Sequence, residues 1–394
     1  MRGARLLLVL VSAAVALVVA EAVAPLVLPR RCGRGNAPLW RPTRDAGWSL
    51  MPNAEGDVAV CDATGGEIAR HHVVINAGGQ RDRPRRRERT PGVPRVLVLG
   101  DSFVEALQVD LSDTFTAQLE DRLGIEVLNA GVSGYATDNE VRAFTATGLA
   151  YHPDAVLLVF YVGNDVLENG ARLYLRDPRG LPAKPWLRSD GVSGRLAACL
   201  AVHRAAARVS AAIPAALWRT SRIVRFGAVL GVDEMLAAAC AGATGAPRLA
   251  GVPELLGVYE PPATPAWAEA WETTEQSLRE LARSVQEAGM AFGVALASAA
   301  FEYDAAMRVH ERMYPATREV AWQWEYPSKR LGAFLDGEAI RWVSLRPAFE
   351  RHYRETGRPG AYVWDGHWDA EGHAVVADTL APFVSGLVRD RVPR

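Results

Sequence analysis

Lysine is almost absent from this chain of 394 residues, and the chain also lacks an excess of either positive or negative charge. Lys184 and Lys329 are the only lysines among 44 basic residues, and 45 acidic residues balance these to a formal charge of −1. A balanced chain gives no reason to expect a nucleic acid or an acidic polymer as partner. The preference for arginine, together with abundant alanine, is typical of a GC-rich genome rather than of a function.

Cysteine is also scarce, and its spacing matches no metal-binding pattern. The four cysteines are Cys32, Cys61, Cys199 and Cys240. An even number suits an oxidising compartment, where local pairing would join Cys32 to Cys61 and Cys199 to Cys240. Four unrelated buried thiols are the alternative, and the sequence leaves both open. We expect no metal ion and no other cofactor.

The N-terminus carries the one long apolar run. Arg2 and Arg5 precede an apolar stretch from Leu6 to Leu28, which reaches the length of about 20 residues that a membrane helix needs. Cleavage by a signal peptidase near residues 20–24 is the alternative to an anchor. We favour the anchor because the apolar run continues past that point. Arginines at 30–34 argue against export, yet we place the body outside the cytoplasm, either anchored or secreted after cleavage.

Three regions follow from composition and pattern. Residues 1–28 form the anchor or signal segment, and residues 29–90 a small β-rich segment with glycine turns. That segment ends in an arginine-rich run at 81–89, which we interpret as a solvated linker, or alternatively as a contact for anionic lipid headgroups. Residues 91–394 form the main domain, with an alanine-rich helical insertion at about 170–265.

Strands and helices alternate along the main domain, which predicts an α/β fold with a parallel sheet covered by helices on both faces. The expected strands are 96–99, 125–128, 155–162, 290–297 and 340–345. The expected helices are 113–123, 137–149, 271–288, 327–335 and 370–387, with 195–212 and 232–241 in the insertion. In such sheets the functional site lies at the carboxyl ends of the strands.

The residues that follow these strands can perform acyl transfer. Ser102 follows the first strand, and His367, which can accept the serine proton, lies after the fifth. Asp365 would orient the imidazole and stabilise the imidazolium. The backbone N–H groups of Ser102 and Gly131 and the side-chain amide of Asn164 would stabilise an oxyanion. The neighbouring carboxylates Asp101 and Asp165 would support their loops by local hydrogen bonds.

These blocks resemble the SGNH (GDSL-type) hydrolases, and their order along the chain matches. The blocks are Gly100–Phe103, Gly131, Gly163–Asp165 and Asp365-x-His367, and the segment Asn76–Asp82 resembles one found in bacterial, envelope-associated members. The resemblance implies a flavodoxin-like three-layer α/β/α fold with five parallel strands in the order 2-1-3-4-5. It also implies Ser102 as nucleophile, Gly131 and Asn164 in the oxyanion hole, and the His367–Asp365 pair.

One spacing departs from the family pattern. Many members place the aspartate three residues before the histidine, where this chain has Trp364, whereas Asp365 precedes His367 by two. Residues i and i+2 of an extended segment face the same side, so Asp365 remains our candidate. Asp369 is the rival, although we expect it to cap the helix that follows. Trp364 and Trp368 are interpreted as core residues, or alternatively as a platform for a sugar ring.

The sequence therefore predicts a serine esterase that acts through an acyl-serine intermediate. We expect the substrate to be an O-acetylated carbohydrate of the cell envelope, on the basis of resemblance and location. An O-acetyltransferase to a polysaccharide, a lipase or lysophospholipase, and a non-catalytic carbohydrate-binding protein are the alternatives. The acyl acceptor and the oligomeric state are left open.

Overall fold

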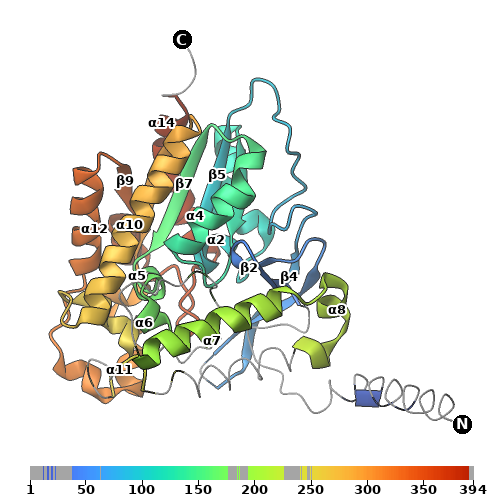
Figure 1. The fold of residues 1–394 in the computed structure, drawn as a ribbon. Helices are drawn as coiled ribbons and strands as arrows, with labels where there is room; N and C mark the ends of the chain where they lie inside the picture. Colours follow the sequence, from blue (N-terminus) through green and yellow to red (C-terminus); the bar gives the residue numbers. More distant parts are fainter. Residues whose placement is uncertain are drawn as a thin grey trace, which may run out of the picture.

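The computed structural model describes residues 38–389, apart from 63, 176–183, 185, 187–193, 226–239, 241, 246–248 and 250 (Figure 1). Before residue 38 it describes only positions 12, 16, 19, 20 and 23. The predicted anchor, residues 1–28, and the expected helix at 232–241 thus lie almost wholly outside the described residues. Within the described part, no helix combines the length and the hydropathy of a membrane span.

A five-stranded parallel sheet forms the centre of the molecule. Its strands are β5 (Arg95–Gly100), β6 (Glu126–Gly131), β7 (Ala155–Tyr161), β8 (Ala291–Ala297) and β9 (Arg341–Ser344). They lie in the order β6-β5-β7-β8-β9 and pair in parallel throughout. All six residues of β5 are buried, because helices cover both faces of the sheet. The predicted order 2-1-3-4-5 is confirmed.

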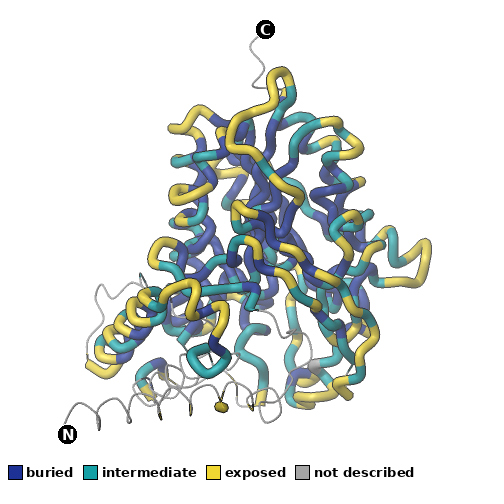
Figure 2. Tube along the Cα trace, turned by 90° about the vertical axis from the view of Figure 1, so that its right-hand side faces the viewer, coloured by how far each residue is buried: buried dark blue, intermediate teal, exposed yellow. Residues whose placement is uncertain are grey.

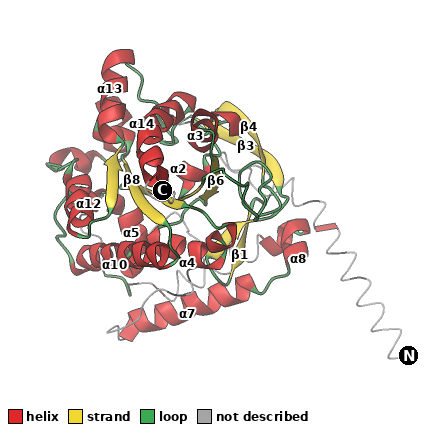
Figure 3. Cartoon of the chain, turned by 90° about the horizontal axis from the view of Figure 1, so that it is seen from above, coloured by secondary structure: helices red, strands yellow, loops and turns green. Residues whose placement is uncertain are grey.

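Helices cover the two faces of the sheet in two layers, as the view from above shows (Figure 3). One layer contains α3 (Phe115–Leu123), α13 (Arg346–Thr356) and α14 (Ala370–Arg389), and the other contains α4 (Thr137–Ala146), α10 (Pro265–Glu287) and α12 (Tyr326–Gly337).

Each face of the sheet has its own hydrophobic core, because side chains alternate along a strand. Val96 and Val98 pack with α14, whereas Leu97 and Leu99 pack with α10. Figure 2 shows the buried strands inside an exposed outer layer of helices and turns. The predicted three-layer α/β/α architecture is therefore present.

Several element boundaries differ from expectation by a few residues, including those of α10 and β6. Helix α10 begins six residues earlier than predicted, at Pro265, because Thr264 caps it by accepting the Trp267 N–H and proline suits the first turn. Strand β6 continues to Gly131. The segment Asn129–Gly131, which we expected after the strand, is its last three residues.

The N-terminal segment consists of two antiparallel hairpins, as its β-rich pattern indicated. Strands β1 (Trp40–Thr43) and β2 (Gly47–Leu50) form one, and β3 (Glu55–Cys61) and β4 (Glu67–Val74) form the other.

The arginine-rich run that follows these hairpins is not simply a solvated linker. Arg81 is only 2% exposed, and Arg85 is paired with Asp82 and Glu120. Backbone carbonyls accept hydrogen bonds from Arg81, and carboxylates pair with Arg85, so the side chains of these two arginines are buried against the main domain. A count of charges in the sequence does not reveal such partners.

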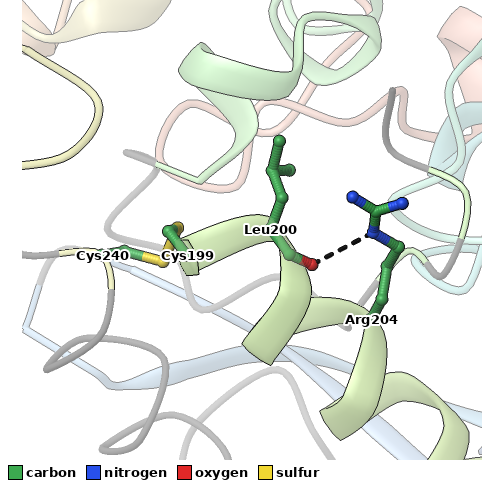
Figure 4. Close-up of a disulfide and its surroundings, with 4 residues drawn as sticks. All are labelled: Cys199, Leu200, Arg204 and Cys240. Atoms are coloured by element: carbon green, nitrogen blue, oxygen red, sulfur yellow. Dashed lines mark hydrogen bonds between the residues drawn. A yellow bond between two sulfur atoms is a disulfide. The ribbon is translucent and has the colours of Figure 1, made fainter. Parts of the chain in front are cut away.

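The described part of the insertion is helical, as predicted. It contains α7 (Gly194–Ala211) and α8 (Ala215–Thr220), preceded by the short α5 (Asp165–Asn169) and α6 (Ala171–Tyr174). A disulfide joins Cys199 to Cys240, so of the two alternatives that the sequence left open, local pairing holds for these two cysteines (Figure 4). Cys61 is disulfide-bonded as well, and its predicted partner Cys32 lies outside the described residues.

Candidate active site

The serine of the first block begins a helix at the carboxyl end of β5. Helix α2 spans Ser102–Glu105, and Asp101 caps it by accepting the backbone N–H of Phe103 at 2.9 Å. Asp101 is fully buried, so its carboxylate fixes the turn between strand and helix. The turn leaves Ser102 half-buried at the edge of the sheet.

Three side chains form a chain of hydrogen bonds at this edge. Ser102 Oγ lies 2.7 Å from His367 Nε2, and His367 Nδ1 lies 2.6 Å from Asp365 Oδ1. The same carboxylate oxygen accepts the backbone N–H of His367 at 3.3 Å. The short spacing is possible because Asp365 lies in a turn closed by the Gly366 N–H, which donates to the Tyr362 carbonyl at 2.8 Å. Serine, imidazole and carboxylate are therefore arranged as acyl transfer requires.

The electrostatics of the pair favour a charged imidazole beside a charged carboxylate. Burial lowers the pKa of His367, but the hydrogen bond and the charge of Asp365 outweigh it, and the pKa is raised above its ordinary value. Burial likewise raises the pKa of Asp365, and the same contact with His367 outweighs it, so this pKa is lowered. His367 is held as a base stronger than free histidine.

The residues around the histidine separate into core and surface. Asp369 accepts the Gly372 N–H at 2.9 Å in the first turn of α14, which is the capping role expected for it. Trp368 is 2% exposed and contacts Phe103, with ring centroids 4.8 Å apart, so it is a core residue. Trp364 is 40% exposed, and the guanidinium of Arg312 lies 5.1 Å from its ring centroid. Only Trp364 of the two is therefore accessible to a ligand.

At the end of β6, the backbone N–H that makes no hydrogen bond to a described residue belongs to Gly134, whereas we expected it to belong to Gly131. The Gly131 N–H donates to Asn129 Oδ1 at 3.0 Å, so it is not available to an oxyanion. A glycine is needed at position 131 for packing, because a Cβ there would lie 2.4 Å from the Glu105 backbone nitrogen. Within the described residues, the N–H groups of Ser102 and Gly134 make no hydrogen bond. Gly134, which our reading of the sequence missed, has φ of +76°, and the pair Ser133-Gly134 was the available turn signal.

Asn164 lies between carboxyl groups beyond the end of β7. Its Nδ2 donates to Glu168 Oε1 at 3.1 Å, and its amide also contacts Asp101. Asp165 accepts the Tyr161 N–H at 2.9 Å and thus holds the loop, as expected. Burial raises the pKa of Asp101 to about 6, despite the Phe103 N–H, the charge of His367 and the Asn164 amide. Buried acids therefore surround the amide and fix its plane.

His373 is a helix-capping residue. Its Nδ1 accepts the backbone N–H of Phe115 at 3.2 Å, at the first turn of α3. It is 1% exposed, and burial lowers its pKa to about 3. His373 therefore caps α3 rather than its own helix.

Comparison with known proteins gives structural neighbours only. No family model and no curated protein matches the chain. Among solved structures, a GDSL-like lipase from Bacteroides thetaiotaomicron is 9% identical, covers 74% of this chain and 88% of its own, and has a TM-score of 0.35. An acetyl xylan esterase is 11% identical, with coverages of 74% and 99% and a TM-score of 0.40. A catalytic mutant of an acetylxylan esterase from Geobacillus stearothermophilus is 14% identical, with coverages of 73% and 93% and a TM-score of 0.36.

These identities and TM-scores are too low to carry an assignment by themselves. The four sequence blocks, the sheet order and the hydrogen-bond chain from Ser102 to Asp365 are independent observations on this chain. Together they match the architecture that the resemblance to the SGNH (GDSL-type) hydrolases implied.

Proposed function

We propose that the protein is an SGNH-type serine esterase that hydrolyses an ester through an acyl-serine intermediate. The observation that carries this proposal is the continuous hydrogen-bond chain from Ser102 Oγ through His367 to Asp365, at 2.7 and 2.6 Å. A serine hydroxyl needs such a base to become a nucleophile.

The first half-reaction acylates the serine. Ser102 Oγ attacks the ester carbonyl while its proton passes to His367 Nε2, and Asp365 stabilises the imidazolium. The carbonyl oxygen becomes an oxyanion, which accepts hydrogen bonds from the backbone N–H groups of Ser102 and Gly134. The Asn164 amide joins these donors when its Nδ2 exchanges the bond to Glu168 for one to the oxyanion. The C–O bond then breaks, and the imidazolium returns its proton to the leaving alcohol.

The second half-reaction releases the acid. Water gives a proton to His367 as its oxygen attacks the acyl carbon, and a second tetrahedral intermediate forms at the same donors. Its collapse breaks the bond to Ser102 Oγ, which takes the proton back from His367. If a sugar hydroxyl replaces water in this step, the same site is an acetyltransferase.

Loss of one residue tests the chemistry. We expect wild-type protein to release 4-nitrophenol from 4-nitrophenyl acetate and to be labelled at Ser102 by a fluorophosphonate. Ser102→Ala should lose both, with a rate lower by about 10³-fold or more. Equal activity of the two proteins would remove the serine mechanism and favour a non-catalytic binding protein.

We further propose that the acyl group is acetyl and that its carrier is a carbohydrate. The exposed indole of Trp364 is adjacent to Asp365 and carries Arg312 over its ring, and such an aromatic surface suits a sugar ring. An acyl-chain-length series tests the acyl group, because a preference for eight carbons or more would favour a lysophospholipase.

The carrier is tested separately with Trp364→Ala. We expect it to raise KM for an acetylated polysaccharide by about tenfold, which is about 1.4 kcal/mol of lost binding, while KM for 4-nitrophenyl acetate stays unchanged. Equal effects on both substrates would contradict a sugar-binding role.

We place the enzyme outside the cytoplasm, anchored by residues 1–28. The disulfide between Cys199 and Cys240 supports an oxidising compartment. An alkaline phosphatase fused to the C-terminus should be active in intact cells, and activity of a cytoplasmic reporter alone would contradict export.

A further inference from the structure

Ser133, in the loop after β6, is held from two sides by different parts of the chain. Its backbone N–H donates to Glu105 Oε2, at the last residue of the helix that begins with Ser102. Its carbonyl oxygen accepts the indole N–H of Trp48 at 2.9 Å, from strand β2 of the N-terminal hairpin. The loop is thus fixed between the nucleophile helix and a hairpin that precedes the main domain.

The contact with the hairpin extends beyond this bond. Tyr135 donates its hydroxyl proton to the Trp48 carbonyl, and the two rings pack edge to face with centroids 5.3 Å apart. Asn139 Nδ2 donates to the Ala46 carbonyl at 3.0 Å. Trp48 and Tyr135 are 2% and 1% exposed. The indole N–H of Trp48 therefore has a fixed direction, set by buried neighbours on both of its sides.

Glu105 is fixed from the same N-terminal segment. Its carboxylate is fully buried and accepts the Trp40 indole N–H at 3.4 Å. The buried guanidinium of Arg81 donates to the carbonyl of Glu105, at the end of α2, and to those of Ala106 and Val109 beyond it. A buried carboxylate and a buried guanidinium are costly to desolvate and contribute little net stability. Their placement beside the nucleophile helix therefore points to the geometry of the site rather than to the stability of the fold.

The geometry of the peptide bond connects these contacts to the chemistry. The Ser133 carbonyl and the Gly134 N–H belong to one planar trans peptide unit, so they point in opposite directions. Trp48 fixes the direction of the carbonyl and hence that of the Gly134 N–H. That N–H makes no hydrogen bond within the described part of the chain. The loop carrying it is joined to the strand before Ser102 by the Val132 N–H, which donates to the Gly100 carbonyl at 3.0 Å.

We infer that Trp48 of the N-terminal hairpin is a positioning residue for the esterase reaction, orienting the Ser133–Gly134 peptide so that its N–H stabilises the oxyanion. This inference rests on the proposed function. It makes the β1–β2 hairpin a part of the catalytic centre rather than an accessory module. Because a misplaced donor acts on the transition state, its loss should lower kcat and leave KM and the acid–base pair unchanged.

Trp48→Phe, made in the full chain, tests the inference by removing the donor and keeping an aromatic ring. The readout is kcat for 4-nitrophenyl acetate divided by the number of serines that a fluorophosphonate labels at completion, so misfolded molecules do not count. We expect kcat per labelled serine to fall about 10- to 100-fold, since removal of a whole donor costs about 10²–10³. KM should stay within about threefold, and the pH profile should keep its midpoint.

Trp218→Phe is the matched control. The Trp218 indole N–H donates to the Trp40 carbonyl at 2.8 Å, so it bonds the same hairpin without touching Ser133. We expect this variant to keep kcat within about threefold of wild type. If Trp48→Phe does not fold, β-(3-benzothienyl)alanine at position 48 keeps the bicyclic shape, lacks the N–H, and should give the same loss.

Two results would overturn the inference: a Trp48 variant with wild-type kcat per labelled serine, or an equal loss in Trp218→Phe, which would indicate general loosening of the hairpin. Failure of the proposed function looks different, because wild-type protein itself would then neither hydrolyse the ester nor be labelled at Ser102.

Discussion

At the scale of single residues, the two-residue spacing between Asp365 and His367 has a simple physical basis. The turn closed by the Gly366 N–H brings the Asp365 carboxylate to the edge of the ring, so it contacts both Nδ1 and the backbone N–H of His367. The exposed fractions of these side chains are 24% and 23%, low enough for the ion pair to shift both pKa values. A spacing of two residues thus gives the same carboxylate–imidazole contact that many SGNH hydrolases make with a spacing of three.

The pH profile should show this pairing. Only neutral His367 can accept the serine proton, and its pKa is raised above the ordinary value of 6.5. Activity should therefore be lost as pH falls through a midpoint above 6.5, measured as kcat/KM for the free enzyme. Asp365→Asn should lower that midpoint and reduce kcat on the order of 10⁴-fold. An unchanged midpoint in Asp365→Asn would show that a group other than His367 causes the loss of activity at low pH.

Gly131 should be required for packing rather than for a hydrogen bond. A methyl group there would meet the backbone of α2 at 2.4 Å, so Gly131→Ala should destabilise the fold by about 1–3 kcal/mol, measured by thermal unfolding. Gly386 in α14 is the control, because nothing lies within 4 Å of its Cβ position, and Gly386→Ala should be neutral or stabilising. Equal melting temperatures for both variants would contradict the steric account.

At the scale of elements, helix α3 depends on a side chain that comes from the far end of the sequence. His373 in α14 accepts the Phe115 N–H in the first turn of α3, and 258 residues separate the two. Such a cap fixes two helices of the same layer against each other. It also requires the imidazole to stay neutral, because an imidazolium has no lone pair with which to accept the N–H.

This cap should make stability depend on pH. The pKa of His373 is lowered to about 3 in the fold, against 6.5 in the unfolded chain, chiefly by burial. Between these values the unfolded chain binds a proton that the fold does not, so stability is lost as pH falls from 6.5 towards 3, by about 1.4 kcal/mol per pH unit.

His373→Gln should remove that dependence while leaving a polar side chain at the cap. Between pH 7 and 4.5, we expect the variant to lose about 2–3 kcal/mol less stability than wild type, measured by urea unfolding at each pH. Parallel losses in the two proteins would show that His373 does not titrate between fold and unfolded chain.

At the scale of the whole molecule, segments far apart in the sequence are fastened around one sheet edge. Arg81 and Trp48 attach the N-terminal hairpins to the loops after β5 and β6. Trp218 of the insertion in turn donates to the first hairpin. In Figure 1, α7 and α8 lie beside these hairpins, at the end of the molecule opposite the C-terminus. Hydrogen bonds thus connect the N-terminal hairpins, the insertion and the main domain to one another.

The disulfide of the insertion should stabilise the folded chain. Cys199 and Cys240 are separated by 41 residues, and closing a loop of that length is worth about 4 kcal/mol at most in the chain-entropy estimate. The double variant Cys199→Ala/Cys240→Ala should have a lower melting temperature than wild type and keep its kcat. Added reductant should lower the melting temperature of the wild-type protein by more than the double substitution does, because Cys61 is also in a disulfide. An unchanged melting temperature would contradict a stabilising role.

The sequence by itself determined the order of strands and helices and the residues presented at the sheet edge. Buried parallel strands consist of continuous apolar runs, and Ser102 and Asn164 follow two such runs closely, so local pattern was sufficient to place these two candidates at the sheet edge.

Only the tertiary structure decided which backbone N–H groups are free and which arginines are buried. The choice between Gly131 and Gly134 depends on whether Asn129 folds back onto its own strand, and the role of Arg81 depends on carbonyls more than 20 residues away. A donor bonds to whichever acceptor lies within about 3 Å of it. That distance depends on how segments pack together, and residue type alone does not determine it.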